Sequence, residues 1–476
     1  MRIVGRKEET KLMRSYLNDE KAHLVAVVGR RRVGKTFLVR EVYKENKVFE
    51  MIGFKDADLK TQHKNFSLQI DTYFPSEKEC GTPDSWLLAF NTLTKSLTAI
   101  INDRKPVVFF DELPWIAGKR SGFTEALAHW WNNWASQQNI IVIICGSAAS
   151  WMLEHVVNAK GGLHNRITKL ITLMPFSLKE TKEFIESQDI QISNYQIIQL
   201  YLVMGGIPFY LEQIRKGKSA IQNIQDICFT KDGILRNEFE NLYPALFDNA
   251  GNHIKIIKAI ATKLKGVERQ EILKISGMTD GGWFSNILKE LESSGFISSS
   301  DPMGKKKKDT LYRLTDEYSY FYLRFIESSA NSNVNDWINI SAGQEYKIWC
   351  GYAFESLCLK HVDNIKHALG ISGVQTQVNS FLHRKNSTYE KGFQIDMLID
   401  RKDDVINLCE MKFHSDEFTI STDYAKTLRT KKEGLKAVTG TKKMVHTTFI
   451  TTYGVLDSQN KIDLVDNDFT IELFFE

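Results

Sequence analysis

Three apolar runs in the first third of the chain have the composition of buried parallel strands. They are residues 24–28, 107–110 and 140–145. Strands that are covered on both faces consist of nearly continuous apolar residues, whereas half-exposed strands alternate. After the first run, Leu38, Val42 and Tyr43 recur at helical spacing and predict a helix with one buried face. The pattern predicts an α/β architecture built on a parallel sheet.

From residue 252 the pattern changes to short helices. "HIKIIKAIATKL", "ERQEILKISGM" and "GGWFSNILKELESSGFI" read as three helices, and residues 298–325 read as strand, basic turn and strand. Three helices followed by a β-hairpin is the order of a winged helix, whose third helix fits a DNA major groove. In that helix we expect three buried residues, Leu288, Leu291 and Phe296, and three exposed ones, Ser285, Asn286 and Lys289.

Four lysines, residues 305–308, occupy the turn of this predicted hairpin. Lysines at a wing tip can neutralise DNA phosphates and make binding sensitive to salt. Lysines in a hairpin turn are equally explained as solvated charge, and a winged helix can also pack domains together or bind a partner. The sequence leaves these interpretations open.

A period-two pattern appears near the C-terminus, where "DVINLCEMKF" reads as a strand. One face of it carries Ile406, Leu408, Glu410 and Lys412. "FQIDMLID" reads as the preceding strand and "RKDD" as the turn. A hairpin centred on Asp403 would place Asp396 opposite Glu410, with Cβ atoms roughly 5 Å apart. Facing carboxylates repel each other, and a divalent cation would make the pair favourable.

Bulk composition limits the class of protein. The chain has 476 residues, which predicts three or four domains. Its 62 basic and 58 acidic residues leave a net charge of +4, so any basic footprint for nucleic acid must be local. The six cysteines show no CxxC spacing and are expected to be reduced and structural. The charged N-terminus and the shortness of every apolar run predict a cytoplasmic protein with no membrane partner.

The stretch "GRRRVGKT", residues 29–36, lies between the first apolar run and the predicted helix. In this strand–loop–helix context, G-x-x-x-x-G-K-[ST] binds nucleotide phosphates. Gly29 and Gly34 let backbone N–H groups curl around phosphate oxygens. Lys35 would meet the β and γ phosphates, and Thr36 would ligate Mg²⁺. The other predicted ATP contacts of the loop and the helix N-terminus are Arg30, Arg31, Arg32, Val33 and Phe37.

The second and third apolar runs end in polar residues. Asp111 and Glu112 follow the second run; Asp111 would hold Mg²⁺ through water, and Glu112 would orient the attacking water as general base. The alternative is a capped strand end. Ser147 follows the third run, where it would sense the γ-phosphate or cap the next helix. The predicted cofactors are ATP and Mg²⁺.

With these motifs, residues 1–250 resemble the archaeal-type ATPase family within the AAA+/STAND group of P-loop NTPases. "IVGRKEE" matches the group's motif near the adenine and contains Gly5 and Arg6, and "GGIPFYL" matches its lid motif with Pro208. "HNRITKLITLMPFS" resembles the family's GRxxxxxxLxPF segment, with Arg166 at the arginine position and Asn165 in place of the usual glycine. The resemblance implies five parallel strands with helices on both faces, an all-α lid, and ATP used as a slow switch. Arg166 is interpreted either as a catalytic, charge-stabilising finger or as part of a structural salt bridge.

The acidic hairpin has the composition of a phosphodiesterase site. Asp396 and Glu410 offer hard oxygen ligands for Mg²⁺ or Mn²⁺, and Lys412 would orient the nucleophilic water. The spacing also resembles the PD-(D/E)xK nuclease fingerprint, with Ile395 where the name expects proline. Glu355, on the preceding helix, stands where these nucleases often carry an additional metal-binding acid. The resemblance implies an α/β, restriction-endonuclease-like domain.

Four domains are therefore expected: a P-loop ATPase core at 1–176, a helical lid at 177–250, a winged helix at 251–326 and a nuclease-like domain at 330–476. The first hypothesis is an ATP-regulated, metal-dependent DNA nuclease. The second is an ATP-switched regulatory or assembly protein, for example a homo-oligomer, whose C-terminal domain binds DNA or a partner without cleaving. A third, transcription control through the winged helix alone, is disfavoured by the neutral charge and the lack of a basic recognition helix.

Overall fold

The computed structural model describes residues 2–476 except 102, 119, 158–161, 164, 248, 264, 302–309, 330–336, 384 and 386–388. The four lysines predicted at a wing tip lie outside the described residues. The chain separates into two compact units, Met1–Pro175 and Phe176–Glu476. Among the described helices, none is both long and apolar enough to cross a membrane. All six cysteines are free thiols, as predicted.

The first unit is built on a five-stranded parallel sheet with the order β2-β3-β4-β1-β5. Its strands are β1 (His23–Val28), β2 (Lys47–Ile52), β3 (Val107–Asp111), β4 (Ile141–Gly146) and β5 (Lys169–Thr172). Every residue of β1, β3 and β4 is buried, because both faces of the sheet are covered. The prediction of five parallel strands is confirmed.

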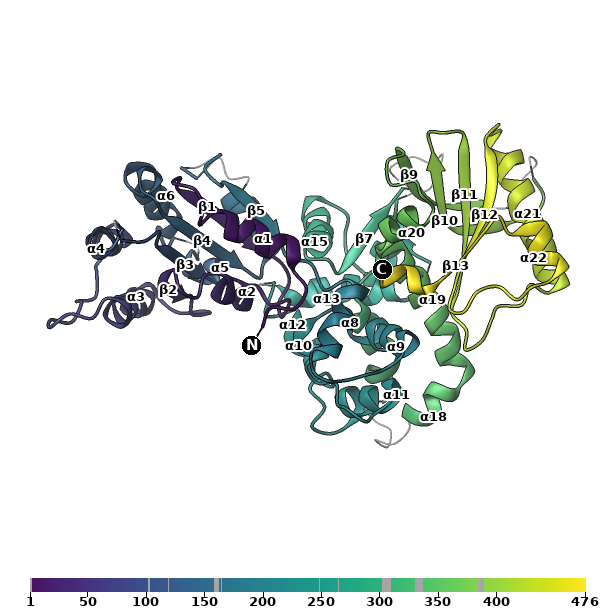
Figure 1. The fold of residues 1–476 in the computed structure, drawn as a ribbon, viewed down its shortest axis with the longest axis horizontal. Helices are drawn as coiled ribbons and strands as arrows, with labels where there is room; N and C mark the ends of the chain where they lie inside the picture. Colours follow the sequence, from purple (N-terminus) through teal and green to yellow (C-terminus); the bar gives the residue numbers. More distant parts are fainter. Residues whose placement is uncertain are drawn as a thin grey trace. The chain divides into compact units, whose positions relative to one another are not determined.

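Helices α3, α4 and α6 lie together beside this sheet (Figure 1). Their aromatic residues, including Phe66, Phe90 and Trp130, share one core with alternate residues of the central strands. The helical segments of this unit are α1 (Lys7–Ser15), α2 (Lys35–Val42), α3 (Leu59–Tyr73), α4 (Trp86–Thr98), α5 (Leu113–Ile116), α6 (Phe123–Asn133), η1 (Ala135–Gln137), α7 (Ala149–Met152) and η2 (Leu153–Val157).

The second unit begins with a helical segment that corresponds to the predicted lid. It contains α8 (Leu178–Glu186), α9 (Asn194–Met204), α10 (Pro208–Leu211), α11 (Ala220–Ile224), η3 (Gln225–Phe229) and α12 (Glu238–Leu242). This segment shares a buried core with residues that follow the predicted hairpin. The Tyr318 hydroxyl donates to the carbonyl oxygen of Leu235 at 2.6 Å and accepts from the backbone N–H of Phe239 at 3.0 Å.

The next segment has the predicted order of three helices and a hairpin. It contains α13 (Ala250–Ala261), β6 (Val267–Glu268), α14 (Arg269–Ser276), α15 (Gly282–Ser293), β7 (Ile297–Ser300) and β8 (Leu311–Leu314), with an antiparallel sheet of order β6-β8-β7. In and after α15, Leu288, Leu291 and Phe296 are buried, as predicted. The prediction that Ser285 is exposed is wrong: it is half-buried, because its hydroxyl accepts a hydrogen bond from Arg269 at 2.9 Å.

A second five-stranded sheet closes the chain, with the order β13-β12-β11-β10-β9. Pairs β9–β10 and β10–β11 are antiparallel, and pairs β11–β12 and β12–β13 are parallel. Its strands are β9 (Thr376–His383), β10 (Phe393–Arg401), β11 (Val405–Lys412), β12 (Met444–Thr451) and β13 (Asn467–Thr470). Met397 pairs with Cys409, which confirms the predicted register of the hairpin.

Helices flank this sheet, and Figure 1 shows α21 beside it. Leu435 of α21 shares a core with Leu398 of β10 and Leu408 of β11. The remaining helical segments are α16 (Glu317–Phe321), η5 (Tyr322–Ile326), α17 (Glu327–Ser329), α18 (Trp337–Ala342), α19 (Gln344–Lys360), α20 (Val362–Ala368), α21 (Thr422–Thr439), α22 (Gln459–Leu464) and η6 (Ile471–Phe474).

Candidate functional site

The predicted phosphate-binding loop joins β1 to α2 and is shaped by two glycines. A Cβ atom added at Gly29 would overlap the carbonyl oxygen of Leu173, so the loop passes too close to the backbone for any side chain. Gly34 has φ 90° and ψ 23°, a left-handed conformation that favours glycine, and α2 begins at the next residue. The backbone N–H groups at the start of α2 therefore border the loop, where a helix attracts anions.

Lys35 is buried inside this loop. Its Nζ donates to the carbonyl oxygens of Gly29 at 2.8 Å and Arg30 at 3.0 Å, and to the hydroxyl of Ser147 at 3.0 Å. A buried ammonium group needs acceptors for its three donors, and here they are all supplied by the loop and by the end of β4. The ammonium is thus held where the phosphate oxygens of a nucleotide are expected.

Thr36 and Asp111 form the second contact of the site. The Thr36 hydroxyl donates to Oδ2 of Asp111 at 2.6 Å, although the two residues are 75 positions apart. They meet because the loop after β1 and the end of β3 lie at the carboxyl edge of one parallel sheet. A hydroxyl and a buried carboxylate are oxygen donors of the type that Mg²⁺ prefers, so these residues fit the predicted metal role.

Glu112 directly follows β3 in a left-handed conformation, with φ 49°. Its carboxylate accepts from the hydroxyl of Ser147 at 2.7 Å and from the backbone N–H of Ser147 at 3.2 Å. Ser147 therefore links Lys35 to Glu112. Helix α7 begins only at Ala149, and the Ser147 hydroxyl donates to a carboxylate rather than capping that helix.

The N-terminal motif lies against the same loop. Gly5 and Arg6 both have left-handed backbone conformations and precede α1. The buried Arg6 guanidinium donates to the carbonyl oxygen of Val33 at 3.4 Å and lies 3.8 Å from Oε1 of Glu9. The structure thus brings the predicted adenine-side motif and the phosphate loop together.

Arg166 and Pro208 are placed less specifically. Arg166 is exposed and forms no ion pair with another described residue, so the salt-bridge interpretation finds no partner in that part of the chain. Pro208 is the first residue of α10 in the second unit. Among the remaining predicted ATP contacts, Arg30 and Val33 are buried, Arg31 and Arg32 are half-buried, and Phe37 is exposed.

In the second unit, Glu410 is the most enclosed of the predicted acids. Its side chain is 4% exposed, and its oxygens accept hydrogen bonds from Lys431 and from the Tyr424 hydroxyl, both on α21. Lys412 lies 3.5 Å from Oε2 of the same carboxylate. Burial alone would raise the pKa of Glu410, but Lys431 and Lys412 outweigh burial and hold the pKa below its ordinary value.

Asp396 and Glu355 form the other half of the acidic cluster. Burial and the nearby Asp396 carboxylate raise the pKa of Glu355 to about 7, and Lys265 and Lys412 act in the opposite direction. Asp396 accepts from Gln394 at 3.0 Å and lies 3.6 Å from Nζ of Lys265. Within the described residues, no three His, Cys, Asp or Glu side chains are grouped so that they could hold a metal ion. The donor chemistry fits Mg²⁺, but cations of the chain engage these carboxylates.

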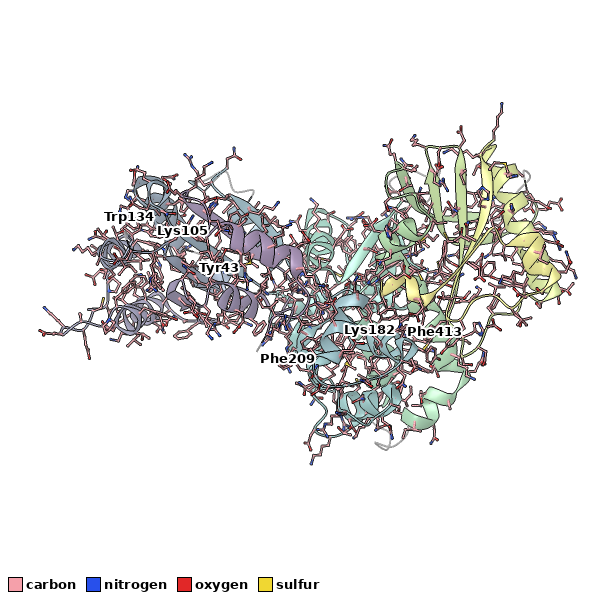
Figure 2. The ribbon with its side chains drawn as sticks, in the orientation of Figure 1. Tyr43, Lys105, Trp134, Lys182, Phe209 and Phe413 are labelled. Carbon is pink, nitrogen blue, oxygen red and sulfur yellow. The ribbon has the colours of Figure 1, made fainter. Side chains whose placement is uncertain are left out.

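Phe413 connects this cluster to the helical segment. It directly follows Lys412 and is labelled in Figure 2. Its ring stacks on Tyr195 of α9 at 5.0 Å between centroids and packs against Phe354 of α19 at 5.4 Å. Phe413 directly follows Lys412, and Phe354 directly precedes Glu355. The aromatic contacts of Phe413 therefore join the chain next to both of these predicted site residues to α9.

Comparison with known proteins agrees with the geometry of the first site. Residues 3–214 match the family model described as an ATPase domain predominantly from Archaea. An uncharacterized protein of Methanocaldococcus jannaschii is 24% identical over 364 residues, which are 75% of this chain and 76% of that protein. An uncharacterized ATP-binding protein of the same organism is 42% identical over 46 residues, 10% of this chain and 78% of that protein.

Residues 3–214 thus match an archaeal-type ATPase domain. Among solved structures, the Walker-type ATPase paby2304 of Pyrococcus abyssi shares the fold, with a TM-score of 0.50 and 20% sequence identity over 68% of this chain and 96% of that one. The family match confirms the predicted resemblance of the N-terminal part to archaeal-type ATPases, whereas the nuclease-like domain remains a prediction.

Four residues of the acidic cluster were missed by sequence reasoning. Tyr424 and Lys431 lie two turns apart on α21, so their shared helical face was a usable signal. Lys265 and Arg313 had no such signal, because they come from a separate segment and reach the cluster only through tertiary packing.

Proposed function

We propose that this chain binds and hydrolyses ATP in its first unit and uses the nucleotide to control a metal-dependent, DNA-cleaving site in its second unit. The observation that supports the ATP part is the hydrogen-bonded network from Lys35 through Ser147 to Glu112. The residues that we propose as phosphate-binding cation, γ-phosphate sensor and general base are in contact at one sheet edge.

In this proposal, ATP binding rearranges that network. Phosphate oxygens are stronger acceptors than carbonyls, so Lys35 turns from Gly29 and Arg30 to the β and γ phosphates. Ser147 then faces the γ-phosphate, and Glu112 is released to orient the attacking water. Thr36 and Asp111 would hold Mg²⁺, which would neutralise phosphate charge when bound.

Three further residues complete the proposed nucleotide site. Arg6 contributes on the adenine side, and Pro208 belongs to the lid. Arg166, which is exposed, is the proposed charge-stabilising arginine. ATP acts here as a switch, so slow turnover is expected.

The proposed DNA site lies at the β10–β11 hairpin. Asp396, Glu410 and Glu355 would hold Mg²⁺ or Mn²⁺, which lowers the pKa of bound water. Lys412, which is half-buried beside Glu410, positions the nucleophile. The three-helix segment 251–326 is proposed as a winged helix that contacts DNA, with Asn286 and Lys289 exposed on α15. The stacking of Phe413 on Tyr195 supports a route by which the lid at 177–250 influences the nuclease-like domain at 330–476.

A plasmid-nicking assay with Mg²⁺ or Mn²⁺, with and without ATP, tests the proposal. We expect nicking by wild type and by Lys402→Ala, an exposed change in the turn between the same strands. Lys412→Ala and the Glu410→Ala, Lys412→Ala double variant should not nick, while their ATP hydrolysis stays intact. Nicking that survives Lys412→Ala in a folded protein would overturn the cleavage proposal.

The second candidate function is an ATP switch whose C-terminal domain binds without cleaving. The engagement of Glu410 by Lys431 and Tyr424 favours it, because these bonds occupy the carboxylate that a metal would need. This candidate predicts no nicking with either metal, although ATP is hydrolysed in the same preparation. It also predicts an elution volume or DNA affinity that changes with ATP in wild type and in Lys44→Ala, which is exposed, but not in Lys35→Ala.

A further inference from the structure

Two cations from the three-helix segment approach the acidic cluster of the C-terminal sheet. Lys265 lies between α13 and β6, and its Nζ is 3.6 Å from Oδ1 of Asp396. The same ammonium group lies 5.8 Å from the ring centroid of Tyr352, on the helix that carries Glu355. Lys265 therefore contacts two of the three elements that supply the proposed metal ligands, β10 and α19.

The second cation, Arg313, lies on β8, the strand that pairs with β6, and β6 begins two residues after Lys265. Val267 of β6 pairs with Tyr312 of β8, which brings the residues before β6 close to Arg313. A Cβ atom added at Gly266 would lie 3.1 Å from Cγ of Arg313, and Gly266 has φ 100°. Glycine at this position thus lets the chain next to Lys265 pass close to the side chain of Arg313.

The Arg313 guanidinium is enclosed without full pairing. Its Nε and one terminal nitrogen are buried and have no hydrogen-bond partner among the described residues. Burial lowers the pKa of Arg313, and the carboxylates of Asp396 and Glu355 oppose that effect. A buried guanidinium that is only partly hydrogen-bonded is costly, and negative charge near it lowers that cost.

We propose that Lys265 is an internal counter-ion that occupies Asp396 beside Glu355 and competes with a divalent cation for this pair of carboxylates. This inference rests on the proposed metal site and adds its regulation. Metal binding requires the β6–β8 edge to withdraw, and any event that moves the three-helix segment, such as DNA binding, opens the site. The chain is thereby kept from cleaving until its middle segment is engaged.

The competition between Lys265 and a divalent cation follows from their positive charges. A metal ion and a lysine ammonium group would both bind the carboxylate oxygens of Asp396, and two cations within a few ångströms repel each other. The ion pair between Lys265 and Asp396 can break, because the Lys265 side chain is 39% exposed and its Nζ is 3.6 Å from the carboxylate oxygen. Glu410 is held separately by α21, so the competition concerns Asp396 and Glu355.

The test measures Mn²⁺ binding to the full chain by isothermal titration calorimetry in the absence of DNA. Lys265→Gln should bind Mn²⁺ at least about tenfold more tightly than wild type, since a competing cation has been removed. The matched control is Lys263→Gln, which removes a charge from the same loop where Lys263 pairs with Glu271, and it should bind like wild type. Asp396→Asn should weaken binding in both backgrounds.

The outcomes separate the counter-ion from the proposed function. Equal Mn²⁺ affinity in Lys265→Gln, Lys263→Gln and wild type, with Asp396→Asn weakened, overturns the counter-ion and leaves the metal site standing. Mn²⁺ binding by none of the proteins overturns the metal site and the counter-ion together. Tighter binding in Lys265→Gln without DNA nicking supports the counter-ion while the cleavage proposal fails. Lys265 is half-exposed, so thermal unfolding can verify that its variant folds like wild type.

Discussion

The hydroxyl of Ser147 donates a 2.7 Å hydrogen bond to the carboxylate of Glu112. A second bond, from the backbone N–H of Ser147, reaches the other oxygen of that carboxylate at 3.2 Å. A carboxylate that is engaged on both oxygens is poorly placed to orient a water molecule. In the observed arrangement, Ser147 therefore holds Glu112, the proposed base, in a position that is unsuited to orienting the attacking water.

Replacing Ser147 tests this relationship. In Ser147→Ala, we expect ATP hydrolysis to slow by about tenfold or more, because the γ-phosphate loses a donor in the transition state. ATP affinity should change little, since in the proposed site Lys35 and the loop would supply most of the ground-state contacts. Phosphate-release kinetics and binding of a fluorescent ATP analogue check the two parts. Ser147→Thr keeps the hydroxyl and should retain activity; a wild-type turnover number in Ser147→Ala would contradict the sensor role.

Gly206 supports the second unit through a close backbone approach. The backbone N–H of Phe176 donates to the carbonyl oxygen of Gly206 at 2.7 Å, and a Cβ atom added at Gly206 would overlap the Phe176 backbone. Gly206→Ala should lower the free energy of unfolding by about 1–3 kcal/mol, because the backbone must shift. Gly251→Ala is the control, since a Cβ added there meets nothing within 4 Å in a helix. Urea denaturation compares them, and equal stability would refute the close-approach argument.

His361 predicts a specific loss of stability in acid. Its ring is buried against Tyr201 and Phe474, and burial lowers its pKa from 6.5 to about 4. Between those values the unfolded chain binds more protons than the folded one. The stabilising contribution is therefore complete above pH 6.5 and is lost as the pH falls toward 4.

The measurement is the unfolding free energy at pH 7 and pH 5. Wild type should lose about 2 kcal/mol through this group over that interval. His361→Gln should show a smaller pH dependence, whatever its absolute stability. His129→Gln, at an exposed position of α6, serves as control and should keep the wild-type slope. Identical slopes in wild type and His361→Gln would refute the assignment.

Local patterns sufficed for the three central strands of the first sheet, for the C-terminal hairpin and for the nucleotide loop. Continuous apolar runs predict central strands because both faces of the sheet are covered, and β1, β3 and β4 are buried throughout. The hairpin register followed from the period of two and the polar turn, and Met397 lies opposite Cys409 as expected. Motif spacing also indicated which residues would meet at the sheet edge, as Thr36 and Asp111 do.

Contacts between segments that lie far apart in the chain could not be predicted from local sequence patterns. Ser285 faces outward by helical periodicity, yet Arg269 of the preceding helix binds it. The approach of Lys265 to Asp396 depends on how two separately patterned segments pack, which no local period encodes. The hydrogen bonds from Tyr424 and Lys431 of α21 to Glu410 also depend on how separate segments pack. Only the shared helical face of these two residues could be read from the sequence.

The ion pair between Lys431 and Glu410 leads to the last prediction. Both side chains are largely buried, with exposed fractions of 13% and 4%. Removing one member of a buried pair leaves an uncompensated charge, which typically costs about 3–5 kcal/mol. When Lys431 is replaced, Glu410 keeps two partners: Lys412, 3.5 Å from its carboxylate, and the Tyr424 hydroxyl. The loss in the free energy of unfolding should therefore be smaller than that range.

Lys431→Met should therefore destabilise the protein by about 2 kcal/mol, less than an unpaired buried charge would cost. Glu410→Gln in the same background should restore part of the loss, because the neutral amide no longer needs a counter-charge. The coupling between the two sites is measured by a double-mutant cycle in urea. Lys426→Met is the matched control on α21, where Lys426 pairs with the exposed Asp423, and it should be nearly neutral. If Lys431→Met and Lys426→Met were equally mild, Lys431 would not compensate the charge of Glu410, and the carboxylate would be open to other ligands.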